Sequence, residues 1–162
     1  WARSIIGLTL LGPPALRDYM AAVLQEDLVA RLQDYQDRLA EAERLGPGAF
    51  EAAFRNPPRG IAVHEFDSSA TILKVNSEEL RLLGYEENQL VGKRIWEFVV
   101  MEDVSRDSVK KKLAGEKDIK PFVRTFRRAD GSGVAMLLVD RRLLDARGEM
   151  RGIRTAMMPL EG

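Results

Sequence analysis

The feature that most constrains the fold is a long stretch, residues 15–45, that contains neither glycine nor proline. Two prolines precede this stretch, and the sequence Gly46-Pro47-Gly48 follows it. Because glycine and proline interrupt helices, the stretch predicts one helix of about eight turns. A helix of this length needs a partner for its apolar side chains, either a second helix or the rest of its own chain.

The apolar positions in the second half of this stretch recur at alternating intervals of four and three residues. They are Leu28, Leu32, Tyr35, Leu39 and Ala42. This spacing is typical of a coiled-coil seam, so we expect a homodimer through a parallel N-terminal helix, with these side chains at the seam. The alternative is a long helix that packs on its own domain.

After Gly60 the pattern changes to short β-rich runs, short helices and then longer β-rich runs. Five strands are predicted at residues 60–66, 70–75, 122–128, 134–144 and 150–158. Residues 103–114 predict the most regular helix of this part. We therefore predict an α+β fold, with an antiparallel five-stranded sheet carrying short helices on one face, after the long helix. The predicted units are an N-terminal segment with the dimerisation helix, residues 1–48, and a domain, residues 49–162.

Composition excludes several classes of protein. The chain has 162 residues, with 25 basic and 25 acidic side chains, one histidine and no cysteine. A net charge of zero provides no electrostatic attraction for nucleic acid or anionic lipid, so we expect neither as a partner. No apolar run is long enough to span a bilayer, so we expect no membrane contact within these residues. The basic run at residues 110–112 is expected on a solvated helix face.

Several short sequences after residue 49 occur in a recognisable order. Residues 72–76 lead into a short helix that is closed by a glycine and an aromatic residue, and a basic stretch later ends in an Asp-Gly turn. This order resembles the PAS sensory domain family over about residues 50–160. The residues that carry this structural signature are Asn76, Gly84, Tyr85, Gly92, Asp130 and Gly131. Caps and tight turns require such residues, which favours a structural role over a catalytic one.

The resemblance implies that a ligand would lie in a small apolar cup between the sheet and the short helices. The candidate lining residues are Val63, Ile72, Leu80, Ile95, Trp96, Phe126, Met136 and Leu138. An unidentified small organic ligand is one expected occupant, and a core filled by these side chains is the alternative.

No cofactor is expected. A cysteinyl-flavin photoadduct of the kind some PAS relatives form is excluded, because the chain has no cysteine. Relatives that bind heme usually take their axial histidine from the helix expected here at residues 103–114, where none occurs. His64 lies instead on the first predicted strand, so we expect an ordinary sheet histidine and no metal site.

The expected function is that of a non-enzymatic sensory module from a larger bacterial protein of the two-component type. It would sense a small ligand or partner and relay the event through a dimeric N-terminal helix. An effector domain of the kinase or cyclase type is expected outside these residues, and a cytoplasmic location is expected, with or without an upstream membrane tether. A ligand-free dimerisation or interaction module is the first alternative. A small hydrolase or isomerase that uses Glu65 is the second.

Overall fold

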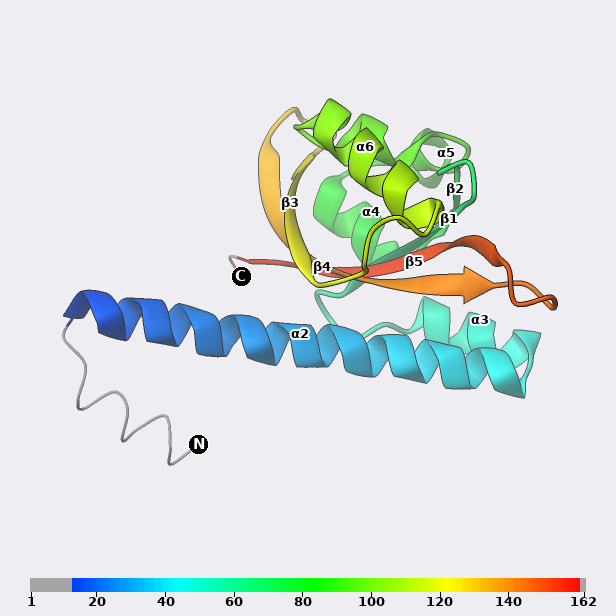
Figure 1. Ribbon diagram of the computed structural model, residues 1–162, viewed down its shortest axis with the longest axis horizontal. Helices are drawn as coiled ribbons and strands as arrows, with labels where there is room; N and C mark the ends of the chain where they lie inside the picture. Colours follow the sequence, from blue (N-terminus) through cyan, green and yellow to red (C-terminus); the bar gives the residue numbers. More distant parts are fainter. Residues whose placement is uncertain (1–12, 161–162) are drawn as a thin grey trace.

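The computed structural model describes residues 13–160, with side chains described from Gln25 onward. Helix α2 (Pro13–Leu45) is continuous, and its 33 residues make it about 50 Å long. Prolines fit its first turn, where no amide donor is required. In Figure 1, α2 lies along one side of the molecule, and its N-terminal turns extend beyond the sheet. Among the described residues, no helix combines the length and hydropathy needed to cross a bilayer.

The elements after α2 alternate between helices and strands in the predicted order. The strands are β1 (Ala62–Asp67), β2 (Ile72–Val75), β3 (Phe122–Arg127), β4 (Gly133–Leu144) and β5 (Met150–Pro159). The helices are α3 (Pro47–Arg55), α4 (Ser77–Leu83), α5 (Glu87–Leu90), the 3₁₀ helix η1 (Ile95–Phe98) and α6 (Glu102–Leu113). The five strands form one antiparallel sheet in the order β2-β1-β5-β4-β3. The predicted fold class is confirmed.

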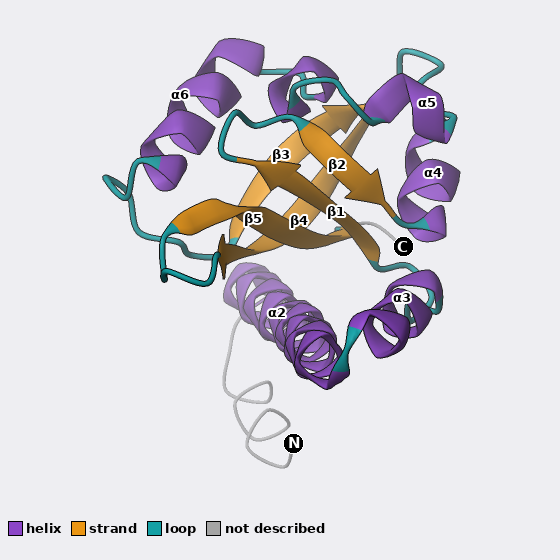
Figure 2. Cartoon of the chain, turned by 90° about the vertical axis from the view of Figure 1, so that its right-hand side faces the viewer, coloured by secondary structure: helices purple, strands orange, loops and turns teal. Residues whose placement is uncertain are grey.

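The sheet is covered on both faces. Figure 2 shows α4, α5 and α6 on one side of the sheet and α2 with α3 on the other. Each face has its own hydrophobic cluster. The larger one, which we call the cup cluster, contains residues such as Phe66, Phe126 and Ile153 and lies under the short helices. The smaller one joins α2 and α3 to the sheet and includes Phe50 and Val139. Alternate residues of each strand therefore serve different cores.

The α2 face corrects the predicted dimer seam. Leu32, Tyr35, Leu39 and Ala42 are between 0% and 9% exposed, and the first three belong to the cluster between α2 and the sheet. Leu28 packs against that cluster and is half-buried. These side chains are covered within their own chain, as in the alternative interpretation. The physical reason is that the apolar stripe lies flat on β4 and β5, so it is not presented to a second helix.

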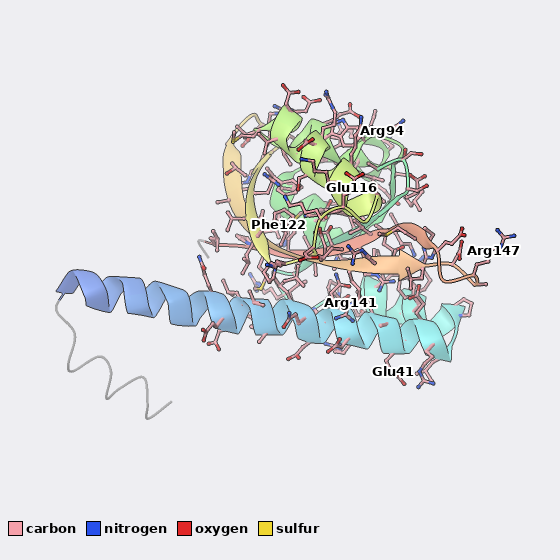
Figure 3. All side chains as sticks on the ribbon, viewed as in Figure 1. Glu41, Arg94, Glu116, Phe122, Arg141 and Arg147 are labelled. Carbon is pink, nitrogen blue, oxygen red and sulfur yellow. The ribbon has the colours of Figure 1, made fainter. Side chains whose placement is uncertain are left out.

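The long helix is therefore joined to the sheet by packing. The division into residues 1–48 and 49–162 stays a prediction, since it concerns folding units and not contacts. The exposed face of α2 carries its charged side chains, and Glu41 points away from the sheet in Figure 3. Arg141 of β4 lies between the sheet and α2 in the same view and forms an ion pair of 2.8 Å with Asp37.

Candidate functional site: a buried polar row in the cup

A row of three polar residues crosses the cup face of the sheet. His64 of β1 lies opposite Thr155 of β5, and Thr155 lies opposite Asp140 of β4. Directly opposed residues of an antiparallel sheet share one face, so the three side chains enter the cup together. His64 and Thr155 are each 1% exposed, and the Asp140 side chain is 4% exposed. We call these residues the polar row.

The imidazole of His64 is held from one side only. Its Nδ1 lies 2.7 Å from Oε1 of Glu79 on α4, and both side chains are 1% exposed. Its Nε2 is buried and has no hydrogen-bond partner in the part of the chain that the structure describes. Burial disfavours the charged imidazolium, but the carboxylates of Glu79, Asp140 and Glu65 together outweigh burial and raise the pKa of His64 above its ordinary value. The charged form would donate from both ring nitrogens, which leaves an N–H that needs an acceptor.

The other end of the polar row is held by α6. Asp140 accepts a hydrogen bond from the Thr155 hydroxyl at 2.6 Å and one from Nζ of Lys112 at 3.1 Å. The Lys112 side chain is 4% exposed, so the predicted solvated face is wrong for this residue. Burial is the largest cause and lowers the pKa of Lys112; Asp140 opposes this effect, and the cations Lys117 and Arg124 add to it, so that the pKa is lowered overall.

A small cavity lies beside the polar row. Its volume is about 20 Å³, and a single water needs about 10 to 15 Å³ on the same measure. The cavity therefore has room for one water or for a ligand only slightly larger. Thirteen residues line it: His64, Phe66, Ile95, Val99, Ser105, Val109, Lys112, Phe122, Arg124, Phe126, Leu138, Asp140 and Thr155.

The predicted lining residues are divided by the structure into three groups. Ile95, Phe126 and Leu138 line the cavity. Ile72, Trp96 and Met136 belong to the cup cluster without lining the cavity, and Leu80 packs against that cluster from its edge. Val63 is a correction, because it lies in the cluster on the α2 face. Successive side chains of a strand point to opposite faces of the sheet, so Val63, which is next to His64 in β1, points away from the cup.

The signature residues hold turns around the cup. The Asn76 side chain caps α4 by accepting from the amide of Glu79 at 3.0 Å, and it also bonds Val63 and Ile61 of the neighbouring segment. Gly84 closes α4 with a φ of 80°. The Tyr85 hydroxyl donates to the Arg127 carbonyl at 2.7 Å.

The other signature residues, Gly92, Asp130 and Gly131, also lie in tight turns. Gly92 has a φ of 90° between α5 and η1. Asp130 accepts hydrogen bonds from the amide and hydroxyl of Ser132 and adjoins Gly131, whose φ is 89°. These residues shape the walls of the cup, and none of them lines its cavity.

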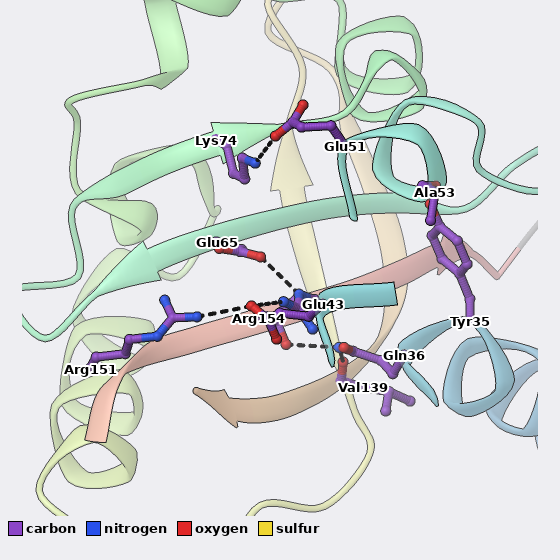
Figure 4. A network of polar contacts seen from close by, with 10 residues as sticks. All are labelled: Tyr35, Gln36, Glu43, Glu51, Ala53, Glu65, Lys74, Val139, Arg151 and Arg154. Atoms are coloured by element: carbon purple, nitrogen blue, oxygen red, sulfur yellow. Dashed lines mark hydrogen bonds and ion pairs between the residues drawn. The ribbon is translucent and has the colours of Figure 1, made fainter. Parts of the chain in front are cut away.

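A second polar cluster lies on the α2 face, directly behind the polar row. Gln36 of α2 is buried, and its Nε2 donates to the carbonyls of Val139 at 3.1 Å and Arg154 at 2.8 Å. Figure 4 shows this contact beside the buried guanidinium of Arg154. Nε of Arg154 donates to Glu65 at 2.8 Å, and its NH2 group lies 3.3 Å from Glu43 of α2. The cluster binds α2 to β4, β5 and β1.

Helix α3 is held by neighbouring contacts. The Tyr35 hydroxyl donates to the Ala53 carbonyl at 2.6 Å, and burial raises the pKa of Tyr35 to about 12. Lys74 of β2 forms an ion pair of 2.6 Å with Glu51, which Figure 4 also shows. The first bond joins α2 to α3, and the ion pair joins α3 to the edge strand β2.

The chemistry available in the cup is that of binding and proton uptake. A buried imidazole with a free nitrogen, a buried ammonium and a guanidinium can hold a small polar molecule. No cluster of three metal-ligating side chains occurs in the part of the chain that the structure describes. Glu65, the carboxylate of the enzymatic alternative, faces the α2 side and is engaged by Arg154.

Sequence reasoning did not bring the polar row together. His64 alternates with Ala62 and Phe66, while Val63 alternates with Ile61, so both faces of β1 are apolar and the period of two leaves the phase open. Asp140 and Thr155 are polar residues at one end of an apolar run, but each lies directly beside an arginine, Arg141 and Arg154, so neither stood out as a site residue. Neither Gln36 nor Lys112 carried a signal, because both lie on helices rich in exposed polar residues.

The strand order, with short helices over one face, defines the PAS fold. A family model described as "PAS domain" matches residues 58–158, which is more than half of the chain. The chain belongs to the PAS domain family. This membership indicates a sensory or signalling module.

Solved structures agree with that family. The PAS domain of an HTR-like protein from Haloarcula marismortui is 26% identical, with a TM-score of 0.59, over 78% of this chain and 98% of that chain. A PAS domain from Colwellia psychrerythraea is 16% identical, with a TM-score of 0.59, over 67% and 92% of the two chains. The LOV protein of Rhodobacter sphaeroides is 17% identical, with a TM-score of 0.53, over 80% and 68%. The last two likenesses show the fold alone. No curated protein matches the chain.

Proposed function

We propose that the chain is a non-enzymatic sensory module of a signalling protein, in which a change inside the cup is relayed through the sheet to α2. Membership of the PAS family supports the sensory role. In this proposal α2 acts on an effector of the kinase or cyclase type that lies elsewhere in the protein. The proposed location of the protein is the cytoplasm. The relay does not require the apolar stripe of α2 to form a dimer.

One observation carries the proposal. The polar row and the contacts of Gln36 involve consecutive residues of the same two strands. Asp140 enters the cup, and the carbonyl of the preceding Val139 accepts from Gln36. Thr155 enters the cup, and the carbonyl of the preceding Arg154 accepts from the same amide. A displacement of Asp140 and Thr155 therefore reaches α2 through a single peptide unit on each strand.

The relay needs two arrangements of α2 with different affinities for whatever changes in the cup. Oε1 of Gln36 is buried and has no hydrogen-bond partner among residues 25–160, so the polar groups of this side chain are not all satisfied. An unpaired buried polar atom costs about 1 to 3 kcal/mol, which lowers the stability of the arrangement in which α2 packs on the sheet relative to an arrangement in which it is shifted. Glu43 adds a partly exposed ion pair that a small shift of α2 would break.

The test uses Thr155→Val, which removes the hydroxyl from the cup and keeps the side-chain shape. We expect hydrogen exchange of the α2 amides around residues 32–42 to accelerate severalfold. Thr125→Val, at an exposed threonine of the edge strand β3, is the matched control and should leave this exchange unchanged. The effect of Thr155→Val should also disappear in a Gln36→Leu background, because the connecting amide is gone. An unchanged α2 in the Thr155→Val protein contradicts the relay.

The small cavity favours a second candidate, a ligand-free interaction module. An exposed apolar group supports it: Val100, Met101 and Val104, at the start of α6, are 54%, 60% and 48% exposed. Native mass spectrometry of the purified chain distinguishes the two. A bare dimer that Met101→Ser dissociates would support the interaction module, and a bound small molecule lost on denaturation would support the sensor. A bare monomer would exclude dimerisation as the role of this chain.

A further inference from the structure

We propose that the cup binds a small monovalent oxyanion, of the size of formate, at the free nitrogen of His64, with uptake of a proton by this residue. This inference names the ligand class for the proposed sensor and rests on that function for its biological meaning. The binding itself is measured independently of any response in α2. Four properties of the cup carry it: the size of the cavity, the direction of His64, the charge of the surrounding groups and the position of the opening.

The cavity sets the size of the ligand. At about 20 Å³ it exceeds the space that one water needs and excludes an extended organic molecule. Formate, with three heavy atoms, is the smallest carboxylate. A tetrahedral ion such as sulfate has five heavy atoms and does not fit without displacing the walls.

His64 determines which atom of the cup can bind the anion. Glu79 holds Nδ1, so only Nε2 is available to the cavity, and it has no partner among the described residues. A fully buried donor or acceptor without a partner costs about 1 to 3 kcal/mol. When the ring is protonated, Nε2–H is a charge-assisted donor, and a carboxylate oxygen is its natural acceptor.

The charges around His64 leave an excess of one positive charge when the ring is protonated. The anions are Glu79 from α4 and Asp140 from β4, and the cations are His64, Lys112 from α6 and Arg124 from β3. Among these five groups three cations stand against two anions, so one monovalent anion balances their charge.

The remaining neighbours add one anionic influence, because Glu65 also raises the pKa of His64, although Glu65 is itself paired with Arg154. From β5 the cup receives Thr155, which is uncharged, while Arg154 and Glu65 pair with each other on the opposite face. Lys117, in the loop after α6, donates to Ser108 and adds a further cation near Lys112. Burial is the first cause of the lowered pKa of Lys112; Asp140 opposes it, and the nearby cations Lys117 and Arg124 lower the pKa further.

The outer wall of the cavity provides an entrance. Phe122 and Arg124, both half-buried, lie on the edge strand β3, and Figure 3 shows Phe122 on β3. Nζ of Lys112 lies 3.5 Å from the centre of the Phe122 ring, a cation–π contact that forms part of this wall. Rotation of Arg124 would admit an anion from solvent without moving the core of the sheet.

The test uses the fact that the chain has a single histidine, so a tag-free protein gives one set of imidazole signals in NMR. The pH titration of His64 is recorded with sodium formate and, at equal ionic strength, with sodium sulfate. We expect formate to move the His64 midpoint to higher pH and sulfate to leave it unchanged. Formate affinity should fall about tenfold per pH unit above the midpoint, because binding takes up one proton. Identical curves in the two salts overturn the proposal.

Two variants sharpen the test. Arg124→Gln removes a half-buried cation at the entrance and should weaken formate binding severalfold without unfolding the protein. Arg147→Gln, at an exposed arginine in the turn between β4 and β5, removes the same charge away from the cup and is the matched control. Equal formate affinities in these two variants overturn the inference. His64→Gln, where it folds, should abolish the pH dependence of binding.

The outcomes separate this inference from the relay. Formate binding at His64 with no change in α2 exchange supports the ligand class and contradicts the relay. A response of α2 to Thr155→Val in a protein that binds no formate supports the relay and contradicts the ligand class.

Discussion

Replacing Leu39 by alanine tests whether the apolar stripe of α2 packs on its own sheet. The Leu39 side chain is 0% exposed and lies in the cluster between α2 and the sheet. Leu39→Ala removes three buried carbons, worth about 0.8 kcal/mol each, or about 2.4 kcal/mol in transfer free energy. The cavity that remains raises the expected loss, since measured leucine-to-alanine changes in cores cost about 2 to 5 kcal/mol. We expect a loss of about 3 kcal/mol in the free energy of unfolding.

The assay is urea unfolding of the wild type and the variant at two protein concentrations that differ by about a hundredfold. Packing within the chain predicts the same midpoint at both concentrations, and the same loss for the variant. The matched control is Leu45→Ala, at the end of the same helix, where the side chain is 70% exposed. This control should change stability by less than about 0.5 kcal/mol.

Two results would refute the reasoning. A loss below about 1 kcal/mol for Leu39→Ala would mean that the side chain is not part of a packed core. A wild-type midpoint that rises with protein concentration, and loses this dependence in Leu39→Ala, would mean that the side chain stabilises a dimer. The predicted coiled-coil seam would then hold after all.

Three further predictions concern the sheet. The pKa of His64 is raised in the folded state, so its stabilising effect is complete below the unfolded pKa of about 6.5 and is lost as pH rises through the folded pKa. Urea unfolding measured across these pH values should show the free energy of unfolding decline, and His64→Gln should remove that decline. Lys112→Met should cost about 3 to 5 kcal/mol by leaving Asp140 buried without its cation, and a cost near zero would mean that the pair is solvated. Gly152→Ala should prevent close pairing of β1 and β5, because its Cβ would lie 2.1 Å from the Phe66 carbonyl oxygen; a loss under about 1 kcal/mol in thermal unfolding would contradict that geometry.

Much of the fold follows from local signals. Asn76 is a strong helix cap, and the glycine and Asp-Gly turns separate runs that have clear strand or helix composition. Helix α6 is predicted at residues 103–114 and observed at Glu102–Leu113. Strand β4, predicted at 134–144, is observed at Gly133–Leu144. Such elements depend on neighbours in sequence, which is the information that a single sequence contains.

The contacts between elements were harder to predict. A helix that packs on a sheet and a helix in a coiled coil both repeat apolar residues at intervals of three and four, so Leu32 and Leu39 fit either. The choice depends on whether β4 and β5 offer an apolar face at the matching position. They do, through residues such as Val139 and Ala156, but the phase of a continuous apolar strand cannot be read from its sequence.

The polar row has a cost that packing alone does not explain. Taking the charges of Lys112 and Asp140 out of water is expensive, and apolar replacement of such a buried pair is often neutral or stabilising by about 1 to 4 kcal/mol. We therefore expect the triple variant Lys112→Met, Asp140→Leu and Thr155→Val to fold with stability equal to or above that of the wild type in urea unfolding. If the row serves the relay, α2 exchange in this stable variant should no longer respond to pH in the range where His64 titrates. A triple variant that is both less stable and still responsive would show that Lys112, Asp140 and Thr155 form a structural element, because their replacement would then weaken the fold and leave the signal unchanged.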